Sequence, residues 1–583
     1  MKLRMLILFA FFSLTAFAEK IPQGKAREIA LDFFSRCPEG RSVSQLRMVY
    51  DGESAQSRAA GNDPALFVFD NPTGKGFVVV AGDDAAVPVL GYSYDNEFPE
   101  GELPPNLEDW LQAMKEQVER ARSEGYAPSS RSRSLGQIGD VVVQLKTAQW
   151  DQVDPYNRLC PLDGLHHSVT GCLATAVAII MHYHQWPEKG TGLIPAYATK
   201  SKKIGVPARE LGEPYLWNEM LFAYQAGRYS EESANQVARL MADIGSMVTM
   251  DYSANGSGAS AMNVPAALLK YMDYDKSMQI CSRYEYTQAQ WYYILATELE
   301  NNRPILYNGY NEEAGHSFVL DGYTSDMYFS VNWGWSGYCN GYFRLDALEP
   351  EPGGVGANDE HYNDGQYAVV GIKKNEGGDY VEMLKFSEKG MEASVTEFEQ
   401  NVPFILSIEA IWNMGGGNFT GELLIALVDA EGDLKQVLNG GKVTELPPLR
   451  GLVDLELHCK IDVPIEMGDR IRVYYRSEKT PVWTCIIGGE ECVWELLVSD
   501  AKTIDESTVI RYDKLAKKLT VTVKSGVDVS FESSAGTAMD DRMEVSGNDV
   551  TIRAEGLPLD TYVLKLKKGA EYKEVKIKLG TAQ

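Results

Sequence analysis

The sequence predicts an α+β protein that continues into modules built from β-strands alone. An uncharged run over residues 172–186 has the composition of a buried helix and stops at Pro187. Strand-like runs dominate from residue 304 onward, and helical periodicity disappears after about residue 378. Helices followed by strands within one segment form an α+β order, and alternating strands without helices are typical of a β-sandwich.

Composition and charge limit the classes of protein to which the chain can belong. It has 583 residues, of which 44% are hydrophobic, so wholesale disorder is excluded. A net charge of -27 argues against nucleic acid or an anionic membrane surface as a partner. Eight cysteines are too few for a disulfide framework. One local bridge stays open, between Cys485 and Cys492 across a hairpin centred on Gly488 and Gly489.

The first eighteen residues have the pattern of a signal peptide. A short basic region precedes an apolar stretch over residues 5–14, and Ala-Phe-Ala at 16–18 is a small-x-small cleavage signal. The alternative is a buried N-terminal helix. No later apolar run reaches the ~18–20 residues needed to span a bilayer. We therefore expect removal of residues 1–18 and a protein without a transmembrane segment that is secreted, periplasmic or on the cell surface.

Residues 19–135 are expected to form a small α+β domain. Residues 24–36 and 109–123 have the periodicity of amphipathic helices, and short apolar strands lie between them. The polar stretch 127–134 is interpreted as an exposed linker whose two arginines suit a trypsin-like enzyme. An ordinary tether between domains is the alternative.

Residues 136–375 are expected to form the main α+β domain. A polar amphipathic helix is predicted over residues 231–247. Beyond this domain, residues 378–498 have the pattern of a β-sandwich module and residues 503–583 that of a smaller C-terminal β module. Strands in the main domain are predicted at residues 304–309, 316–323, 328–335 and 341–345.

Cys172 is a candidate nucleophile. It follows Thr170-Gly171 and opens the uncharged helix. The unpaired N–H groups and partial positive charge at a helix N-terminus favour a thiolate. Taken alone, however, a free cysteine is more often buried and inert.

His316 is a candidate partner for this cysteine. A nucleophilic cysteine needs a base that takes its proton and returns it to the leaving amine. His316 lies 144 residues after Cys172 (316 − 172), within the ~130–150 residues typical of papain-type enzymes, although their local signature around the cysteine is absent. Gly315 frees the backbone just before it. A purely structural histidine is the alternative.

Two amide side chains are further candidates for a catalytic site with Cys172 and His316. Asn332 lies sixteen residues after His316 (332 − 316), so a strand, a turn and a second strand return it beside the imidazole, where its oxygen would accept the Nδ1 proton. Trp333 or Trp335 would exclude water there, or would fill an aromatic core hairpin. Gln152 is a candidate oxyanion donor beside the Cys172 N–H, with an exposed loop residue as the alternative.

These stretches resemble the streptopain-like cysteine peptidases of the papain clan. They occur in family order over about 140–375, some 40% of the chain. The matching stretches are WDQVDPYN at 150–157, TGCLATA at 170–176, MHYH at 181–184 with WP at 186–187, LMADIG at 240–245 with MDY at 250–252, GH at 315–316, VNWGW at 331–335 and FRLDA at 343–347.

The resemblance implies a papain-like fold with a defined set of site residues. Cys172 would be the nucleophile and His316 the general base and acid. Gln152 would be the oxyanion donor, and Asn332 with Trp333 would support the histidine. Residues 68–84 (VFDNPTGKGFVVVAGDD) match the inhibitory propeptide of the family, so that residues 19–135 would be this propeptide and would be removed on activation.

No cofactor and no metal are expected. His182 and His184 lie two residues apart on a predicted helix, which splits them between faces, so structural roles are favoured over a metal pair. The glycine-rich stretch 352–358 lacks the Gly-Lys-Ser/Thr pattern of a phosphate loop.

The sequence therefore predicts the secreted zymogen of a cysteine endopeptidase that hydrolyses peptide bonds through a Cys172 thioester. Its expected partners are protein or peptide substrates and its own propeptide as an intramolecular inhibitor. Two other classes stay open. One is a secreted or surface binding protein with an inactive peptidase domain, whose β modules carry the function. The other is a thioester-forming acyltransferase, which uses an amine in place of water.

Overall fold

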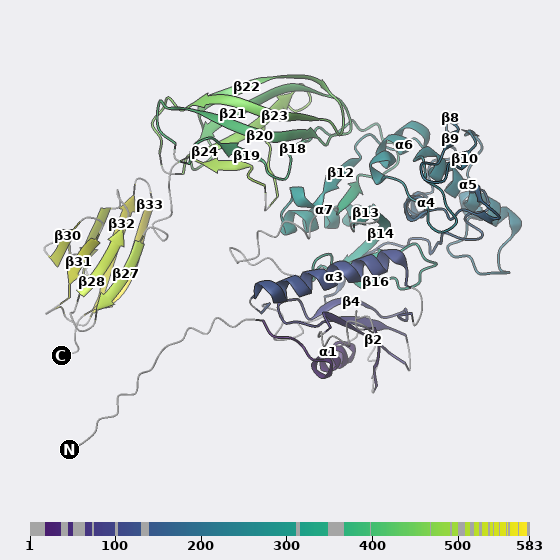
Figure 1. Cartoon of the computed structure of the whole chain (residues 1–583), viewed down its shortest axis with the longest axis horizontal. Helices are drawn as coiled ribbons and strands as arrows, with labels where there is room; N and C mark the ends of the chain where they lie inside the picture. Colours follow the sequence, from purple (N-terminus) through teal and green to yellow (C-terminus); the bar gives the residue numbers. More distant parts are fainter. Residues whose placement is uncertain are drawn as a thin grey trace, which may run out of the picture. The chain divides into compact units, whose positions relative to one another are not determined.

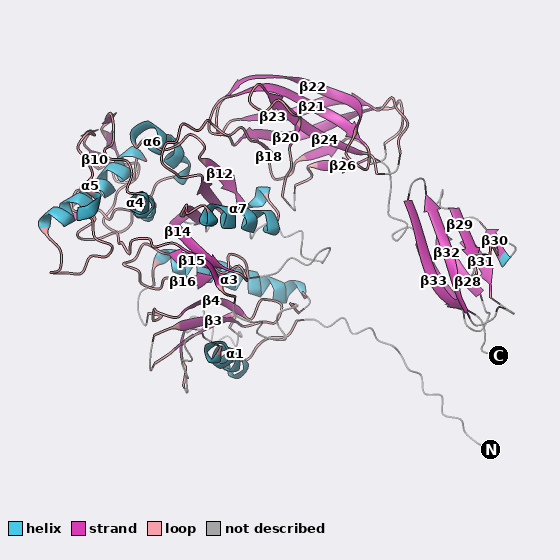
Figure 2. Cartoon of the chain, turned by 180° about the vertical axis from the view of Figure 1, so that it is seen from behind, coloured by secondary structure: helices cyan, strands magenta, loops and turns pink. Residues whose placement is uncertain are grey.

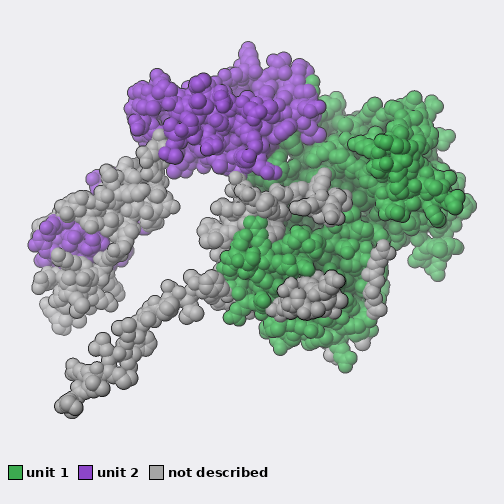
Figure 3. Space-filling model, in the orientation of Figure 1, with its two compact units in different colours: residues 1–383, 413–418, 488–491 green, residues 384–412, 419–487, 492–583 purple. Residues whose placement is uncertain are grey.

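The computed structural model consists of two compact units (Figure 3). One unit holds residues up to 383 together with 413–418 and 488–491, and the second holds the remainder. The structure describes residues 18–36, 45–50, 64–72, 75–99, 103–126, 128–129, 139–310, 315–347, 366–396, 398–466, 468–489, 492–498, 508–513, 518–523, 528–533, 537–539, 542–546, 549–554, 557, 560–568 and 571–579. The predicted signal peptide up to residue 17, most of the predicted linker and the stretch 352–358 lie outside these residues.

One antiparallel sheet of eleven strands runs through the first unit. Its order is β1-β2-β3-β4-β16-β15-β14-β13-β17-β12, and β5 pairs with β14. The strands are β1 Arg47–Tyr50, β2 Leu66–Asp70, β3 Phe77–Ala81, β4 Val89–Ser93, β5 Val141–Gln144, β12 Gln279–Ser282, β13 Ile305–Tyr310, β14 Gly315–Thr324, β15 Phe329–Asn332, β16 Gly341–Phe343 and β17 Tyr367–Val370.

The N-terminal domain joins this sheet through strand addition between β4 and β16. Tyr342 lies opposite Tyr92, and Phe343 lies opposite Gly91. A Cβ atom on Gly91 would lie 2.5 Å from Cδ1 of Phe343, so the absence of a side chain there lets the Phe343 ring pack against the strand. The residues expected to form a propeptide and those expected to form a peptidase therefore share one sheet and one hydrophobic core.

Helices cover both faces of the sheet, with α4, α5 and α6 gathered beside its C-terminal strands and α3 lying along β14 and β16 (Figures 1 and 2). The helices are α1 Gln23–Ser35, α3 Pro105–Glu124, α4 Cys172–His184, α5 Glu231–Met247, α6 Val264–Tyr271 and α7 Gln288–Glu300, with short 3-10 turns at Trp217–Glu219, Ala261–Asn263 and Arg283–Glu285. Small two-stranded ribbons pair β6 Leu162–Asp163 with β7 His166–His167, β8 Leu193–Ile194 with β11 Arg209–Glu210, and β9 Tyr197–Ala198 with β10 Gly205–Val206.

Local sequence accounts for the helix bounds. Every residue from Leu173 to Met181 of α4 is buried, as its lack of charge predicts. The helix ends at His184 rather than at 186, because Gln185 adopts a left-handed conformation (φ 47°). α5 begins where predicted, after Ser230, whose side chain accepts the Ser233 N–H. α3 begins at Pro105, four residues before the predicted start, because proline is tolerated in the first helical turn.

Two antiparallel sheets enclose the core of the first β module in the second unit. This is the β-sandwich that the alternating pattern predicts. One sheet contains β18 Leu384–Phe386, β19 Met391–Ala393, β20 Pro403–Asn413 and β23 Gly451–Lys460; the other contains β21 Phe419–Val428, β22 Leu434–Leu446, β24 Arg470–Ser477, β25 Thr484–Cys485 and β26 Glu495–Leu497.

The C-terminal module also has two sheets around a small core that includes Val521, Phe531, Ile552 and Leu564. One sheet contains β27 Thr508–Asp513, β28 Lys518–Val523, β30 Met543–Ser546 and β31 Asp549–Arg553; the other contains β29 Asp528–Glu532, β32 Asp560–Lys568 and β33 Glu571–Leu579.

The expected hairpin between Cys485 and Cys492 does not form. Cys485 lies in β25 and pairs with Tyr474 of β24, and β26, the next strand, also pairs with β24 rather than with β25. The Cys492 thiol instead donates to the Ser387 carbonyl at 3.5 Å. Both are free thiols, and no disulfide joins any cysteine that the structure describes. None of the described helices is long and apolar enough to cross a membrane.

Candidate active site

Cys172 is the first residue of α4, at a point where the backbone approaches a neighbouring loop closely. Gly171 precedes it with φ 87°, and a Cβ atom on that residue would lie 2.8 Å from the Ser257 carbonyl and 2.9 Å from Cε of Met250. A residue without a side chain is therefore required just before the cysteine. The Sγ atom is partly buried and accepts the backbone N–H of Ser317 at 3.5 Å.

Burial raises the pKa of the Cys172 thiol above its ordinary value. The backbone N–H groups of Ser317 and of Leu173, at the start of α4, oppose this effect by stabilising the thiolate. Desolvation is the larger of these effects. In this conformation, Cys172 is therefore a protonated thiol at neutral pH rather than an activated nucleophile.

His316 is the second residue of β14, and its side chain is one-fifth exposed. Its Nε2 atom lies 3.2 Å from the Oδ2 atom of Asp109 on α3, and burial lowers the pKa of the imidazole. The ring is therefore neutral at pH 7, and its Nε2 edge lies beside the Asp109 carboxylate. This carboxylate belongs to the N-terminal domain.

Cys172 and His316 contact different groups beside β14. The Cys172 Sγ atom accepts the backbone N–H of Ser317, whereas His316 Nε2 lies beside Asp109 of α3. Side chains alternate along a strand, so His316 shares the face of Phe318, whose core also contains residues of α3. The Cys172 and His316 side chains, both described by the structure, make no hydrogen bond to each other in this conformation.

α3 is fixed over this site by hydrogen bonds from its polar side chains to peptidase backbone. Asn106 Nδ2 donates to the Trp333 carbonyl at 2.8 Å and to the Ser317 carbonyl at 3.4 Å. Trp110 Nε1 donates to the Arg344 carbonyl at 2.8 Å. These contacts are to main-chain atoms of strands that carry the predicted site or adjoin it, so α3 packs directly against this part of the sheet (Figure 1).

Asn332, at the end of β15, has both amide protons and one lone pair of its oxygen engaged. Its Nδ2 atom donates to Thr147 Oγ1 and to the Ala148 carbonyl, each at 2.9 Å, and its Oδ1 atom accepts the Gly334 N–H at 3.1 Å. The expected hydrogen bond to His316 is absent in this conformation, in which the imidazole lies against Asp109 of α3.

Gln152 lies on the loop that runs alongside the residues leading to Cys172. Its carbonyl accepts the Thr170 N–H at 3.1 Å, and its own N–H donates to Asp151 Oδ1 at 2.6 Å. Asp151 Oδ2 in turn accepts the Ser336 hydroxyl at 2.6 Å. The loop that carries Gln152 is thus tied both to the segment before Cys172 and to the turn after Asn332.

The two tryptophans after Asn332 differ in their surroundings. Trp333 is 1% exposed, donates from Nε1 to the Cys339 carbonyl at 3.1 Å and packs on Phe318 and Phe343. Trp335 is only partly buried, at the margin of the same core. Trp333 therefore fills the core hairpin that was the alternative to a water-excluding role. Gly315 is the first residue of β14 and pairs with residue 310.

Sequence reasoning missed Asn106 and Asp109. Residues 105–124 were recognised mainly as an amphipathic helix, and these polar side chains were not singled out. The signal that could have found Asn106 is its position on the helix. Asn106 and Gln117 are polar, yet they are buried on the same helix as Trp110 and Met114. A polar side chain that recurs at the positions of an apolar face needs a partner across the interface.

The structure gives the two histidines of α4 separate structural contacts. His182 Nε2 lies 3.3 Å from the Met220 carbonyl, and its ring packs on Trp150. His184 Nδ1 lies 3.4 Å from the Tyr274 hydroxyl, and burial lowers its pKa to about 4. They meet different neighbours, as their spacing predicts. Within the described ranges, no three His, Cys, Asp or Glu residues are placed to hold a metal ion.

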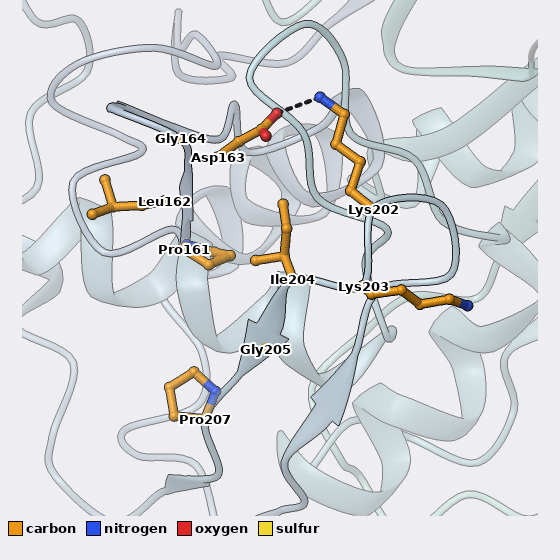
Figure 4. A pocket seen from close by; sticks show the side chains of 9 residues that line it. All are labelled: Pro161, Leu162, Asp163, Gly164, Lys202, Lys203, Ile204, Gly205 and Pro207. Atoms are coloured by element: carbon orange, nitrogen blue, oxygen red, sulfur yellow. Dashed lines mark hydrogen bonds and ion pairs between the residues drawn. The ribbon is translucent and has the colours of Figure 1, made fainter.

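An open pocket of about 680 Å³ lies beside the β6–β7 ribbon (Figure 4). Lys202 Nζ pairs there with Asp163 Oδ2 at 2.5 Å, and the same carboxylate accepts the Ala254 N–H at 2.9 Å. None of the four predicted catalytic residues lines it. Its residues are Pro161, Leu162, Asp163, Gly164, Lys202, Lys203, Ile204, Gly205 and Pro207.

Two family models match the first unit. The model of the peptidase C10 family matches residues 150–343, which include all four predicted catalytic residues. The model of the Spi protease inhibitor matches residues 18–118, which include Asn106 and Asp109. Fold and site thus define a cysteine endopeptidase domain preceded by an inhibitor-type domain.

Individual relatives agree with this class. Streptopain of Streptococcus pyogenes is 32% identical over 372 residues, which cover 60% of this chain and 91% of streptopain. The chain belongs to the peptidase C10 family, the streptopain-like cysteine peptidases. The thiol protease/hemagglutinin PrtT of Porphyromonas gingivalis is 32% identical over 370 residues, which cover 61% of this chain but only 42% of PrtT.

A solved structure also matches the first unit. It is a fragment of prointerpain A from Prevotella intermedia, with 30% sequence identity and a TM-score of 0.46. The match covers 57% of this chain and 99% of that fragment.

Proposed function

We propose that this chain is the secreted zymogen of a cysteine endopeptidase, held inactive because its N-terminal domain engages His316. The single observation that carries the proposal is the 3.2 Å contact between His316 Nε2 and Asp109 Oδ2. One partner comes from the segment that matches a protease inhibitor and the other from the segment that matches a peptidase. Secretion is proposed from the signal-peptide pattern of residues 1–18.

Latency follows from the surroundings of the two side chains. While Nε2 lies against the Asp109 carboxylate of α3, the imidazole is held away from Cys172 and does not take its proton. Burial meanwhile keeps this thiol protonated. When α3 leaves, the His316 ring is free to turn about its side-chain bonds toward Cys172, where proton transfer creates the thiolate–imidazolium pair.

Acylation then uses Cys172, His316 and Gln152. The Cys172 thiolate attacks the carbonyl carbon of a peptide bond, and the oxyanion is stabilised by the Cys172 backbone N–H and the Gln152 side chain. His316 transfers its proton to the leaving amine as the C–N bond breaks. A thioester on Cys172 remains.

Deacylation reverses the proton transfers. A water molecule loses a proton to His316 and attacks the thioester carbonyl. The second tetrahedral intermediate collapses, the C–S bond breaks, and the carboxylic acid product leaves with Cys172 again paired to the imidazolium. Asn332 accepts an imidazole N–H through Oδ1 and so keeps the ring oriented.

The test compares the full chain lacking residues 1–18 with its Cys172→Ala variant under reducing conditions. Each protein is incubated with casein and, separately, with a cysteine-reactive epoxide, and chain mass is followed. We expect only the intact protein to shorten near residues 129–140, to degrade casein and to gain one adduct on Cys172. If both stay full length, the intact protein is cut with trypsin at the linker, freed of trypsin and tested again.

Two outcomes contradict the proposal. If the trypsin-cut protein leaves casein intact and Cys172 unlabelled, it is not a peptidase. If the intact protein forms amide products with an added amine faster than it releases free carboxylates, the thioester serves acyl transfer rather than hydrolysis.

A further inference from the structure

We propose that Thr147 and Asp321 are positioning residues for the same reaction: together they hold the Asn332 amide in the orientation that receives His316. This inference rests on the proposed function. Neither residue touches substrate or the reacting sulfur, and both act through Asn332. Thr147 follows β5, Asp321 lies on β14 and Asn332 ends β15, and both β5 and β15 pair with β14.

The three side chains form a buried chain of hydrogen bonds. Thr147 Oγ1 donates to Asp321 Oδ2 at 2.5 Å. Thr147 Oγ1 also accepts a hydrogen bond from Asn332 Nδ2 at 2.9 Å. Their exposed fractions are 4% for Thr147, 6% for Asp321 and 1% for Asn332, so water competes little for these bonds.

Proton counting gives this chain a direction. A threonine hydroxyl has one proton, and an ionised carboxylate accepts only, so Thr147 gives its proton to Asp321. Thr147 Oγ1 can then only accept a hydrogen bond from Asn332, so the Asn332 side chain has to direct its NH₂ group toward this oxygen. The second Nδ2 proton goes to the Ala148 carbonyl at 2.9 Å. With both amide protons used, Oδ1 is fixed on the opposite side.

The fixed Oδ1 atom is where the reaction needs an acceptor. Asn332 of β15 pairs with Val319 of β14. Val319 belongs to the hydrophobic core that also contains residues of α4, the helix that begins at Cys172. Oδ1 receives the Gly334 N–H and keeps a second lone pair. The acceptor for an imidazole N–H is therefore in place before His316 arrives, and the arriving ring does not have to reorient an amide.

Asp321 is held by further contacts that keep its carboxylate aimed at Thr147. Gln144 Nε2 donates to Oδ1 at 3.3 Å and to Ser330 Oγ at 3.2 Å. The Leu145 N–H donates to the Asp321 carbonyl at 2.7 Å. Tyr342 of β16 donates to Gln144 Oε1 at 2.6 Å, and it is the titratable side chain that faces this group.

Burying a carboxylate costs free energy that an apolar side chain in the same place would not cost. Burial raises the pKa of Asp321 to about 6, which means that its charged form is disfavoured at this position. A role in stability alone does not explain it. A role in directing the Thr147 proton does, because an ionised acceptor removes the alternative in which the hydroxyl donates to Asn332.

The experiment measures kcat and KM of the trypsin-matured full chain on a peptide substrate, with active sites counted by epoxide titration. The variants are Thr147→Val, Thr147→Ser, Asp321→Asn, Asn332→Ala and the double variant Thr147→Val/Asn332→Ala. Thr324→Val is the matched control, because it removes a similar buried bond, from Thr324 Oγ1 to Asp326 Oδ1 at 2.6 Å, away from Asn332.

We expect Thr147→Val to lower kcat about tenfold with KM within twofold of wild type, and Thr147→Ser to restore kcat to within threefold. The double variant should be no slower than Asn332→Ala, because both changes remove the same support. Asp321→Asn should lower kcat several-fold without lowering Tm at pH 7. Thr324→Val should lower Tm and leave kcat per active site unchanged.

Several results would overturn the inference alone. These are wild-type kcat in Thr147→Val or in Asp321→Asn, no rescue by Thr147→Ser, or a double variant whose loss is the product of the single losses. An inactive wild-type enzyme, or Asn332→Ala with wild-type kcat, would instead contradict the proposed function or the role assigned there to Asn332. The two failures are thus distinguishable.

Discussion

His316 and Asp109, separated by 207 residues of sequence (316 − 109), face each other with 3.2 Å between Nε2 and Oδ2. The contact connects the domain that matches an inhibitor with the domain that matches a peptidase. It also holds the imidazole against α3, where it makes no hydrogen bond to Cys172. The contact therefore predicts which change in the N-terminal domain releases the catalytic pair.

Asp109→Ala is expected to weaken latency in the full chain. A contact of this kind between partly exposed groups contributes on the order of 1 kcal/mol, so its loss should raise epoxide labelling of Cys172 about fivefold. The measurement is the labelling rate by intact mass before any chain shortening. Glu108→Gln is the matched control, because Glu108 is an exposed neighbour on the same helix. Equal rates in both variants would mean that Asp109 does not restrain His316.

Alkylation of Cys172 is expected to depend differently on pH before and after maturation. Burial raises the pKa of this thiol in the full chain, so the thiolate forms only at higher pH than for an ordinary cysteine. The rate with iodoacetamide should therefore be low at pH 7 and still rising above pH 9. In the matured enzyme, pairing with His316 should move the rise to lower pH. Coincident pH profiles of the Cys172 peptide, followed by mass spectrometry, would contradict this prediction.

Gly91→Val is expected to loosen the junction between β4 and β16. Its new Cβ atom would lie 2.5 Å from Phe343 Cδ1 and 3.2 Å from Trp110 Cη2, and such overpacking costs about 1–3 kcal/mol. The free energy of unfolding should fall by this amount in a Cys172→Ala background, and epoxide labelling of the active chain should rise. Gly24→Ala is the control, because no atom lies within 4 Å of its Cβ position. Unchanged unfolding in Gly91→Val would show that the junction tolerates a side chain.

Asp321→Asn is expected to change how stability depends on pH. Burial raises the pKa of Asp321 from 3.8 to about 6, so between about pH 4 and 6 the folded protein holds a proton that the unfolded chain has released. The free energy of unfolding therefore falls as pH rises through this window, by about 3 kcal/mol for this group. The variant should be more stable than the parent above pH 6 and not below pH 4.

Urea unfolding of the full chain at pH 4 and pH 7.5, with and without Asp321→Asn in a Cys172→Ala background, checks this sign. Tyr342, whose pKa is raised by burial to about 12, does not titrate in this range. A stability difference that is the same at both pH values would mean that Asp321 ionises in the folded protein as easily as in the unfolded chain.

Sequence by itself determined the local structure and the chemistry of individual residues. The uncharged run fixes α4, the Ser230 cap fixes the start of α5, and period-two alternation fixes the strands, because these signals act over a few neighbouring residues. Local chemistry also singled out Cys172 at a helix start and His316 at a strand start. The strand predicted over residues 328–335 ends instead at Asn332, so the end of β15 did not follow from alternation.

Only the tertiary structure decided which of these groups meet. Alternation along β14 dictates that His316 and Ser317 point to opposite faces, but it does not say which domain covers each face. Docking of α3 brings Asp109 to His316, and the closing of β5 onto β14 brings Thr147 between Asp321 and Asn332. These contacts join segments far apart in sequence. They depend on sheet order and strand register, which no short stretch of sequence encodes.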